Sequence, residues 1–312
     1  MTNTSQPVGT IITTQQWTDA GRTRSELDSE LASQRLVRLR RGVYLRPPAS
    51  DKQQLLRPRL IATAPALGPN TYFSHTSAAA VHGLPLLAKR TKEVVAVRTG
   101  GGHGTITRTL HTRIGRLEQH ETEVVNGLPV TSLTRTVTDL VRSLPFAEAV
   151  MVADAALARG LDRAELLALT EKGRGCRMAH RALLFADERA GSAGESLSRV
   201  RIAEAGLPAP VLQRTVYNAN GIFLARVDFC WEEFGVIGEF DGAIKYDQLL
   251  KPGQSATAVI MHEKRREQLL SDETWWVVRW AWPELWNHGF EPRLRRAMET
   301  RRRERHPWFA SA

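Results

Sequence analysis

Residues 223–242, FLARVDFCWEEFGVIGEFDG, contain two short runs in which apolar and polar side chains alternate. This period of two predicts a pair of β-strands, with Glu233 and Phe234 at the turn between them. If the strands pair antiparallel about that turn, Asp228 lies directly opposite Glu239. The Cβ atoms of opposed residues are ~5 Å apart, so the two carboxylates would repel each other unless a cation lay between them.

The oxygen ligands of this hairpin indicate the kind of cation. Carboxylates are hard donors, which select Mg²⁺ or Mn²⁺ over zinc. The alternative is that both carboxylates are solvated side chains on an exposed hairpin. Trp231, Phe229 and Phe240 favour a central strand pair, and Glu195 adds a third carboxylate in the first turn of a helix predicted within residues 191–208.

This order of residues resembles the PD-(D/E)xK nuclease superfamily, in which a helix Glu is followed by a strand Asp and then by a strand Glu with a nearby Lys. The resemblance runs from Gly191 to Asn287 and is greatest to the group related to very-short-patch-repair endonucleases. The matching stretches here are Glu195-Ser196, Arg226-Val227-Asp228-Phe229, Glu239-Phe240-Asp241-Gly242, Lys264-Arg265-Arg266-Glu267 and Trp276-Val277-Val278-Arg279.

The resemblance implies hydrolysis of phosphodiester bonds with Mg²⁺ or Mn²⁺ as the cofactor. It implies that Asp228, Glu239 and the backbone carbonyl of Phe240 hold the metal. Glu195 would then hold the metal through water or bind a second ion. These roles predict a metal-assisted deoxyribonuclease.

The lysine of the superfamily pattern departs from its usual place. The pattern puts Lys at the position of Asp241, and the nearest lysine here is Lys245. Gly242 permits a sharp turn that would bring Lys245 back over the strand end, where it could orient or deprotonate the attacking water. The alternative is a surface lysine that follows a turn.

The chain is strongly basic, with 43 Lys and Arg against 33 Asp and Glu, a net charge of +10 and a pI of about 10.2. A basic chain favours a polyanionic partner, because phosphate binding releases condensed counterions. The alternative is a chain that is merely soluble and rich in arginine. Arginines gather in residues 35–46 and 293–305, while Arg266 and Arg279 are candidate phosphate contacts or surface ion-pair partners.

Residues 10–46 predict two short helices followed by a basic strand. Thr23 and Glu26 have the spacing of a capping box at the start of the second helix, and Gly42 interrupts the strand. This pattern is typical of a winged helix-turn-helix, and the alternative is a small helical cap on a larger domain. The candidate DNA contacts of the winged helix are Arg24, Arg38, Arg40 and Arg41.

The N-terminal 145 residues resemble actinobacterial proteins grouped with abortive-infection type IV antitoxins. The resemblance is carried by RLRRGVY (38–44), SHTSAAAVHGLP (74–85) and LPVTSLTRTVTDL (128–140). It implies that the N-terminal winged helix binds DNA. These motifs look structural rather than catalytic, so they indicate no reaction.

The whole pattern predicts an α/β (α+β) protein in five parts. The parts are a winged helix (1–50), a mixed α/β region (51–145), a helical connector (146–190), a restriction-endonuclease-like domain with a central mixed sheet flanked by helices (191–290) and a basic C-terminal helix or tail (291–312).

Cys176 and Cys230 cannot make a disulfide framework or a zinc site. No apolar run approaches the ~20 residues of a membrane span. The first ten residues lack the features of a secretion signal. We therefore expect a cytoplasmic protein that does not enter the membrane.

Three functions remain open from the sequence. The first is a DNA-directed, Mg²⁺-dependent endonuclease, with phage defence or DNA repair as its setting. The second is a DNA-binding regulator of antitoxin type, with a toxin or other protein partner and no turnover. The third is a structural subunit that senses DNA ends. The trio Glu195, Asp228 and Glu239 favours the enzyme, and Asp241 in place of lysine favours the regulator.

Overall fold

The computed structural model describes residues 9–47, 55–90, 93–101, 103–107, 109–218, 220–242, 270 and 275–304. Its mixed α/β content, with mixed sheets flanked by helices, agrees with the predicted fold class. The chain divides into two compact units, each made of two separate stretches. Unit 1 comprises Met1–Leu144 and Arg163–His180, and unit 2 comprises Pro145–Asp162 and Arg181–Ala312.

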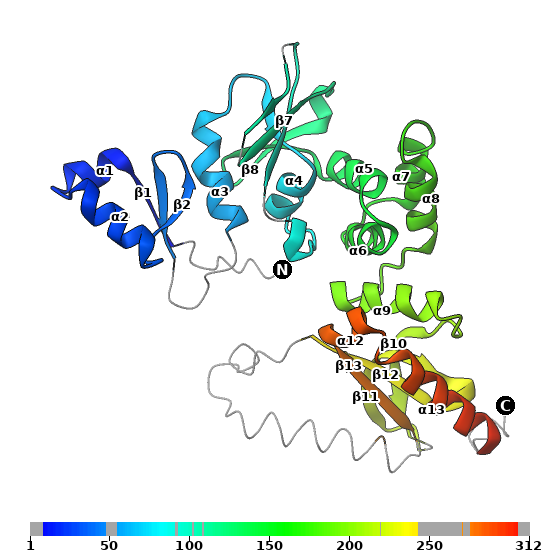
Figure 1. Ribbon diagram of the computed structural model, residues 1–312. Helices are drawn as coiled ribbons and strands as arrows, with labels where there is room; N and C mark the ends of the chain where they lie inside the picture. The colour runs from blue at the N-terminus through cyan, green and yellow to red at the C-terminus, as the bar shows by residue number, and fades with distance from the viewer. Residues whose placement is uncertain are drawn as a thin grey trace. The chain divides into compact units, whose positions relative to one another are not determined.

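The N-terminal part of unit 1 is a helix pair beside a three-stranded antiparallel sheet of order β1-β3-β2 (Figure 1). Its elements are β1 (Thr10–Thr13), α1 (Thr14–Asp19), α2 (Arg24–Ala32), β2 (Val37–Arg40) and β3 (Val43–Arg46). The predicted capping box of Thr23 and Glu26 is confirmed at the start of α2. The short strand β1 was not predicted. Trp17, Leu27 and Tyr44 pack together between the helices and the sheet.

The larger part of unit 1 is a six-stranded mixed sheet of order β6-β7-β5-β4-β9-β8. Its strands are β4 (Thr71–Phe73), β5 (Val94–Arg98), β6 (Thr105–Ile106), β7 (Leu110–Ile114), β8 (Thr122–Val125) and β9 (Leu128–Thr131). Its helices are α3 (Leu56–Thr63), α4 (His75–His82), α5 (Leu133–Ser143) and α7 (Arg163–Leu169), with short 3₁₀ turns η1 (Ala64–Ala66), η2 (Ala88–Arg90) and η3 (Gln119–Glu121). Asn126 and Gly127 both have positive φ and form the hairpin turn between β8 and β9.

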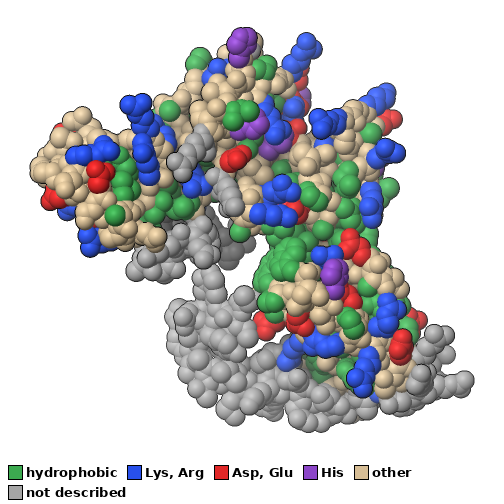
Figure 2. Space-filling view, viewed as in Figure 1, with side chains coloured by type: hydrophobic (Ala, Val, Ile, Leu, Met, Phe, Trp, Pro, Cys, Tyr) green, Lys and Arg blue, Asp and Glu red, His purple; other side chains and the backbone are tan. Residues whose placement is uncertain are grey.

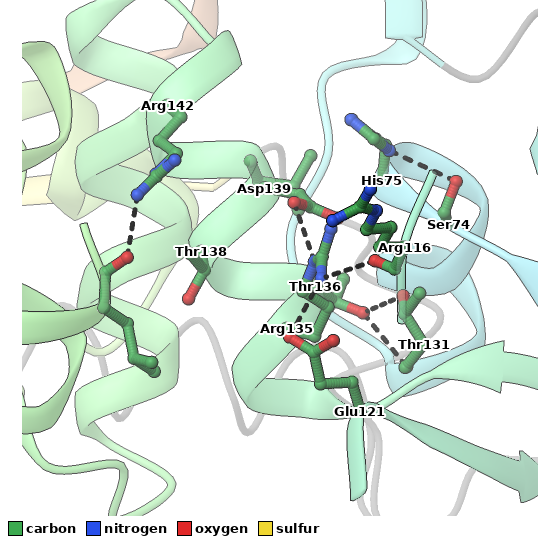
Figure 3. Close-up of polar contacts among 12 residues, drawn as sticks. Ser74, His75, Arg116, Glu121, Thr131, Arg135, Thr136, Thr138, Asp139 and Arg142 are labelled. Atoms are coloured by element: carbon green, nitrogen blue, oxygen red, sulfur yellow. Dashed lines mark hydrogen bonds and ion pairs between the residues drawn. The ribbon is translucent and has the colours of Figure 1, made fainter. Parts of the chain in front are cut away.

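A polar network fixes α5 to the sheet of unit 1 (Figure 3). Arg135 donates hydrogen bonds to Glu121, Asp139 and the backbone carbonyl of Arg116. Beside it, the buried hydroxyls of Thr131 and Thr136 lie 2.7 Å apart. Because Arg135 is held by two carboxylates of its own unit, we assign this network a structural role.

Unit 2 is built on a four-stranded sheet of order β10-β11-β12-β13, antiparallel except for the parallel pair β12 and β13. The strands are β10 (Val211–Tyr217), β11 (Phe223–Trp231), β12 (Val236–Asp241) and β13 (Trp276–Ala281). The helices are α6 (Phe146–Leu157), α9 (Ala193–Glu204), α12 (Trp282–Asn287) and α13 (Glu291–Glu304), with η4 (Glu232–Phe234) between β11 and β12. Helix α8 (Cys176–Phe185) spans the boundary between the units.

A buried ion pair joins α6 to α9 inside unit 2. The Asp154 carboxylate accepts from Arg199 at 2.8 Å and from the backbone N–H of Asp187 at 2.7 Å. Residues 146–190 were expected to be a connector between domains. Instead, α6 belongs to unit 2 and α7 belongs to unit 1, so this stretch is shared between the two cores.

One face of the unit 2 sheet carries an aromatic core. The ring of Trp280 stacks on Phe229 and on Phe290, and its indole N–H donates to the Ser198 hydroxyl of α9. Helix α13 also packs along β12 and β13 (Figure 1). Along β11 and β12, the side chains of Asp228 and Glu239 point to the face of the sheet opposite this core. These two residues define the candidate site.

Candidate functional site

The hairpin of β11 and β12 has the register expected from its turn. The last backbone pair is Phe229 with Gly238, and one further step places Asp228 opposite Glu239. The prediction that these two carboxylates face each other across the hairpin therefore agrees with the structure.

The same register extends across all four strands. In β10, Gln213 lies between residues paired with Phe229 and Val227, so it stands opposite Asp228. In β13, Arg279 pairs with Glu239. We call these four residues, one from each strand, the polar row: Gln213, Asp228, Glu239 and Arg279.

Asp228 is held where β11 and β12 cease to pair. Its Oδ2 accepts a hydrogen bond from the backbone N–H of Phe240 at 3.0 Å, and its Oδ1 accepts from the Gln213 amide at 3.3 Å. The side chain thus replaces a backbone carbonyl as the partner of Phe240. This exchange fixes the orientation of the carboxylate.

Glu195 joins the polar row from helix α9. Ser192 caps that helix by accepting from the Glu195 N–H, and the Glu195 Oε2 accepts from Gly191 N–H and from the Gln213 amide, each at 2.8 Å. Glu195 is only 8% exposed. We call Glu195 together with the polar row the acidic site.

Glu239 and Arg279 form an ion pair within the polar row. The Arg279 Nε lies 2.9 Å from the Glu239 Oε2, and Glu239 is 7% exposed. Arg279 was predicted to contact a phosphate or to form a surface ion pair. The structure places it on a buried carboxylate of the candidate site.

Burial and nearby negative charge raise the pKa of Asp228. Burial, with the smaller effects of the Glu195 and Glu239 carboxylates, raises this pKa to about 6 against the opposing hydrogen bonds from Phe240 and Gln213. Two of the three carboxylates therefore act on the third through space. A cation bound here would relieve that repulsion.

The structure bears differently on the predicted metal site and on the predicted role of Lys245. Among the described residues, no group of three or more His, Cys, Asp or Glu side chains is arranged as a metal cluster. Lys245 and Arg266 lie outside the described residues. Asp241, at the position of the superfamily lysine, ends strand β12.

Gln213 is the member of the acidic site that the sequence reasoning missed. A polar residue inside the run VLQRTVY was available as a signal, since Leu212 and Val216 mark its apolar positions. Its place in the site depends on how β10 pairs with β11, and the alternation of residues within β10 does not determine that pairing.

The basic residues of the N-terminal part differ in what they contact. Arg38 and Arg41 are exposed on and beside β2. Arg40 is partly buried, and its Nε donates to the Ala62 carbonyl at 2.6 Å. Arg24 forms an exposed ion pair with Asp28. Arg38 and Arg41 are therefore open to a phosphate, whereas Arg40 is engaged in the fold.

Helix α2, which would enter the major groove in a winged helix, carries more acid than base. Glu26, Asp28 and Glu30 accompany Arg24. Glu26 serves the capping box, and Glu30 pairs with Arg35 and Arg46.

Lys and Arg side chains are spread over both units on the face seen in Figure 2. The hairpin of β2 and β3, which we call the wing and which carries Arg38 and Arg41, is thus the better candidate for phosphate contact.

Comparison with known proteins identifies relatives of the chain. No family model matches it. Two proteins of Mycobacterium tuberculosis, the uncharacterized protein MT2308 of strain CDC 1551 / Oshkosh and the uncharacterized protein Rv2248 of strain ATCC 25618 / H37Rv, are each 30% identical to it over 264 residues. The match covers 82% of this chain and 89% of each relative. The chain belongs to their family. The match spans most of the chain, and the names of the two relatives state no activity.

A solved structure, the crystal structure of the RV2827C protein from Mycobacterium tuberculosis, is similar at a TM-score of 0.35 and 15% identity. The similarity covers 68% of this chain and 84% of that one. Likeness at this level carries no argument about function. In the part of the chain that the structure describes, no helix is long and apolar enough to cross a membrane.

Proposed function

We propose that this chain is a DNA-binding, divalent-metal-dependent endonuclease that hydrolyses phosphodiester bonds. The acidic site is the observation that supports the proposal. Glu195 and Asp228 share the Gln213 amide there, Glu239 pairs with Arg279, and Arg279 is the one cation among the site's five members. Negative charge in excess of its internal compensation is costly in a buried site and favours a bound cation.

The donors of the acidic site are of the kind that hard divalent cations prefer, although the described residues contain no group of three or more carboxylates placed to hold a metal ion. Asp228 and Glu239 offer carboxylate oxygens from neighbouring strands, and Glu195 is close enough to raise the pKa of Asp228. The superfamily resemblance adds the Phe240 carbonyl. When bound, Mg²⁺ or Mn²⁺ supplies neutralisation of phosphate charge and acidification of water.

The chain's own residues prepare this site for a phosphodiester. The Phe240 N–H and the Gln213 amide orient Asp228, while Arg279 holds Glu239. The superfamily pattern has a positively charged lysine at the position of Asp241. In this chain the guanidinium of Arg279 supplies a positive charge on the polar row instead. We infer that Arg279 stabilises negative charge on the phosphate, alongside any contribution from Lys245.

The expected substrate is DNA. The β1-α1-α2-β2-β3 order of the N-terminal part supports a winged helix, and Arg38 and Arg41 supply exposed positive charge at its hairpin. Such residues bind the phosphate backbone without regard to sequence. The proposal thus assigns DNA attachment to unit 1 and hydrolysis to unit 2.

A cleavage assay on supercoiled plasmid tests the proposal. Wild-type protein should nick or linearise the plasmid with Mg²⁺ or Mn²⁺ and leave it intact in EDTA. Asp228→Asn should lower the rate by about a hundredfold or more, because it removes a charged donor from the site. Glu232→Gln is the matched control, since Glu232 is a partly exposed carboxylate of η4 that pairs with Arg214 outside the acidic site. Its rate should equal that of the wild type.

A second candidate is a DNA-binding regulator of antitoxin type that has no turnover and acts with a toxin or other protein partner. One observation favours it: Arg279 already compensates Glu239, while Asp241 occupies the place of the superfamily lysine. Under this reading, wild-type protein binds DNA yet never cleaves it with either metal. The melting temperature would then be the same in Mg²⁺ and in EDTA.

A further inference from the structure

We propose that Gln213 is a positioning residue, which holds the carboxylates of Glu195 and Asp228 together as a pair able to receive a divalent cation. The proposal rests on the proposed function, because it concerns the same site. It adds a residue that neither the motifs nor the family relatives assign.

The backbone of Gln213 is unusual for its place in the fold. Its φ is +51°, in the left-handed region, although it lies inside strand β10 between residues that pair normally with β11. The other non-glycine residues with positive φ in the described part of the chain lie in turns or at helix ends: Gln34, Asn70, His75, Asn126 and His288. A left-handed residue within a strand costs free energy and persists only where its surroundings enforce it.

The hydrogen bonds of the Gln213 side chain offset the free-energy cost of this backbone conformation. Its Nε2 lies 2.8 Å from the Glu195 Oε2 and 3.3 Å from the Asp228 Oδ1. An amide nitrogen carries two hydrogens, so one group can donate to both carboxylates. Gln213 therefore connects a helix residue to a strand residue across the acidic site.

The choice of an amide has a consequence for charge. A lysine or arginine at this position would bridge the same oxygens and would also cancel one negative charge. Glutamine orients both carboxylates while leaving their charge available to a cation. At the other end of the polar row, Arg279 bridges to Glu239 and does cancel charge. The uncompensated end of the site is thus the one that Gln213 organises.

Substitution by glycine separates this role from a purely structural one. Gly adopts positive φ without strain, so Gln213→Gly should fold with a melting temperature in EDTA close to that of the wild type. It nonetheless removes both donors. We expect the Mg²⁺ concentration at half of the maximal thermal shift to rise about tenfold, and kcat for plasmid cleavage to fall tenfold or more while KM changes less than about twofold.

Two further variants complete the experiment on the full chain. Gln213→Glu keeps the shape but loses the donors, so it should share the kcat loss of Gln213→Gly. Gln213→Asn keeps a donor amide and should recover part of the rate. If Gln213→Gly binds Mg²⁺ and cleaves like the wild type, Gln213 has no positioning role. If the wild type itself shows neither a Mg²⁺ shift nor cleavage, the proposed function fails and this inference fails with it.

Discussion

The carboxylate of Asp228 accepts the backbone N–H of Phe240 one step beyond the last backbone pair of β11 and β12. A side chain therefore completes the pairing of two strands at the candidate site. We therefore expect a change in the charge of Asp228 to alter this hydrogen bond between the two strands. This coupling makes the site visible in measurements of stability as well as activity.

Stability should fall as the pH rises through the titration of Asp228. The folded-state pKa of Asp228 is about 6, raised first by burial, against an ordinary value of 3.8. Between these values the folded chain binds more protons than the unfolded chain, so the free energy of unfolding decreases as pH increases. The loss is up to about 3 kcal/mol, reduced by solvent screening. Urea titrations in EDTA from about pH 4 to about pH 7 measure it.

Asp228→Asn is the control for this pH dependence. Asparagine keeps an oxygen for the Phe240 N–H and cannot ionise. The variant should lack the wild-type loss between about pH 4 and about pH 6 and be the more stable protein at neutral pH. Parallel curves for the two proteins would contradict the raised pKa of Asp228.

The ion pair of Asp154 and Arg199 should be essential to unit 2. The Asp154 side chain is 1% exposed, and burial raises its pKa although the Arg199 guanidinium opposes that effect. Arg199→Leu removes the charged partner of a buried carboxylate and should cost about 3–5 kcal/mol. Chemical denaturation with a double-mutant cycle measures the coupling, and Arg199→Leu combined with Asp154→Leu should cost less than the sum of the single changes.

The exposed pair of Arg24 and Asp28 provides the comparison. Its side chains are 73% and 59% exposed, so removing either charge should cost less than about 1 kcal/mol. Equal losses from the two pairs would show that burial does not govern the interaction of Asp154 with Arg199.

The wing arginines should divide by function. Arg38→Ala with Arg41→Ala should weaken DNA binding and reduce the slope of log K against log salt by about 0.9 for each lost phosphate contact. Arg40→Ala should leave the salt slope unchanged and lower the melting temperature, because it removes the hydrogen bond to Ala62. The opposite division of effects would place the DNA contact elsewhere.

Gly194 should be intolerant of alanine. A Cβ at this position of α9 would overlap the ring of Phe240, the residue whose N–H holds Asp228. Helix propensity alone favours alanine by about 1 kcal/mol, whereas overpacking costs about 1–3 kcal/mol, so we expect net destabilisation. Thermal denaturation measures it, and Phe240→Leu in the same chain should recover part of the loss. A Gly194→Ala variant more stable than the wild type would refute this packing argument.

The sequence predicted local relationships better than distant ones. Asp228 and Glu239 could be placed opposite each other because alternation and a short turn determine the register of a hairpin. The partnership of Glu239 with Arg279 could not be derived, since parallel pairing across a long connection leaves no local pattern. Gln213 was missed for a similar reason, because its contacts depend on a left-handed backbone and on a helix. The sequence likewise predicted that residues 146–190 are helical without showing that α6 and α7 join different cores.

The interleaving of the two units has a consequence for how the protein is made. Asp154 is synthesised 45 residues before Arg199, with part of unit 1 encoded between them. Until the ribosome has completed that intervening stretch, the Asp154 carboxylate and the apolar surface of α6 have no α9 to pack against. Nascent chains are therefore exposed to proteases and chaperones through this interval. A gene fragment that begins after α6 would encode the four-stranded sheet of unit 2 with Arg199 but without Asp154, the buried carboxylate with which Arg199 pairs.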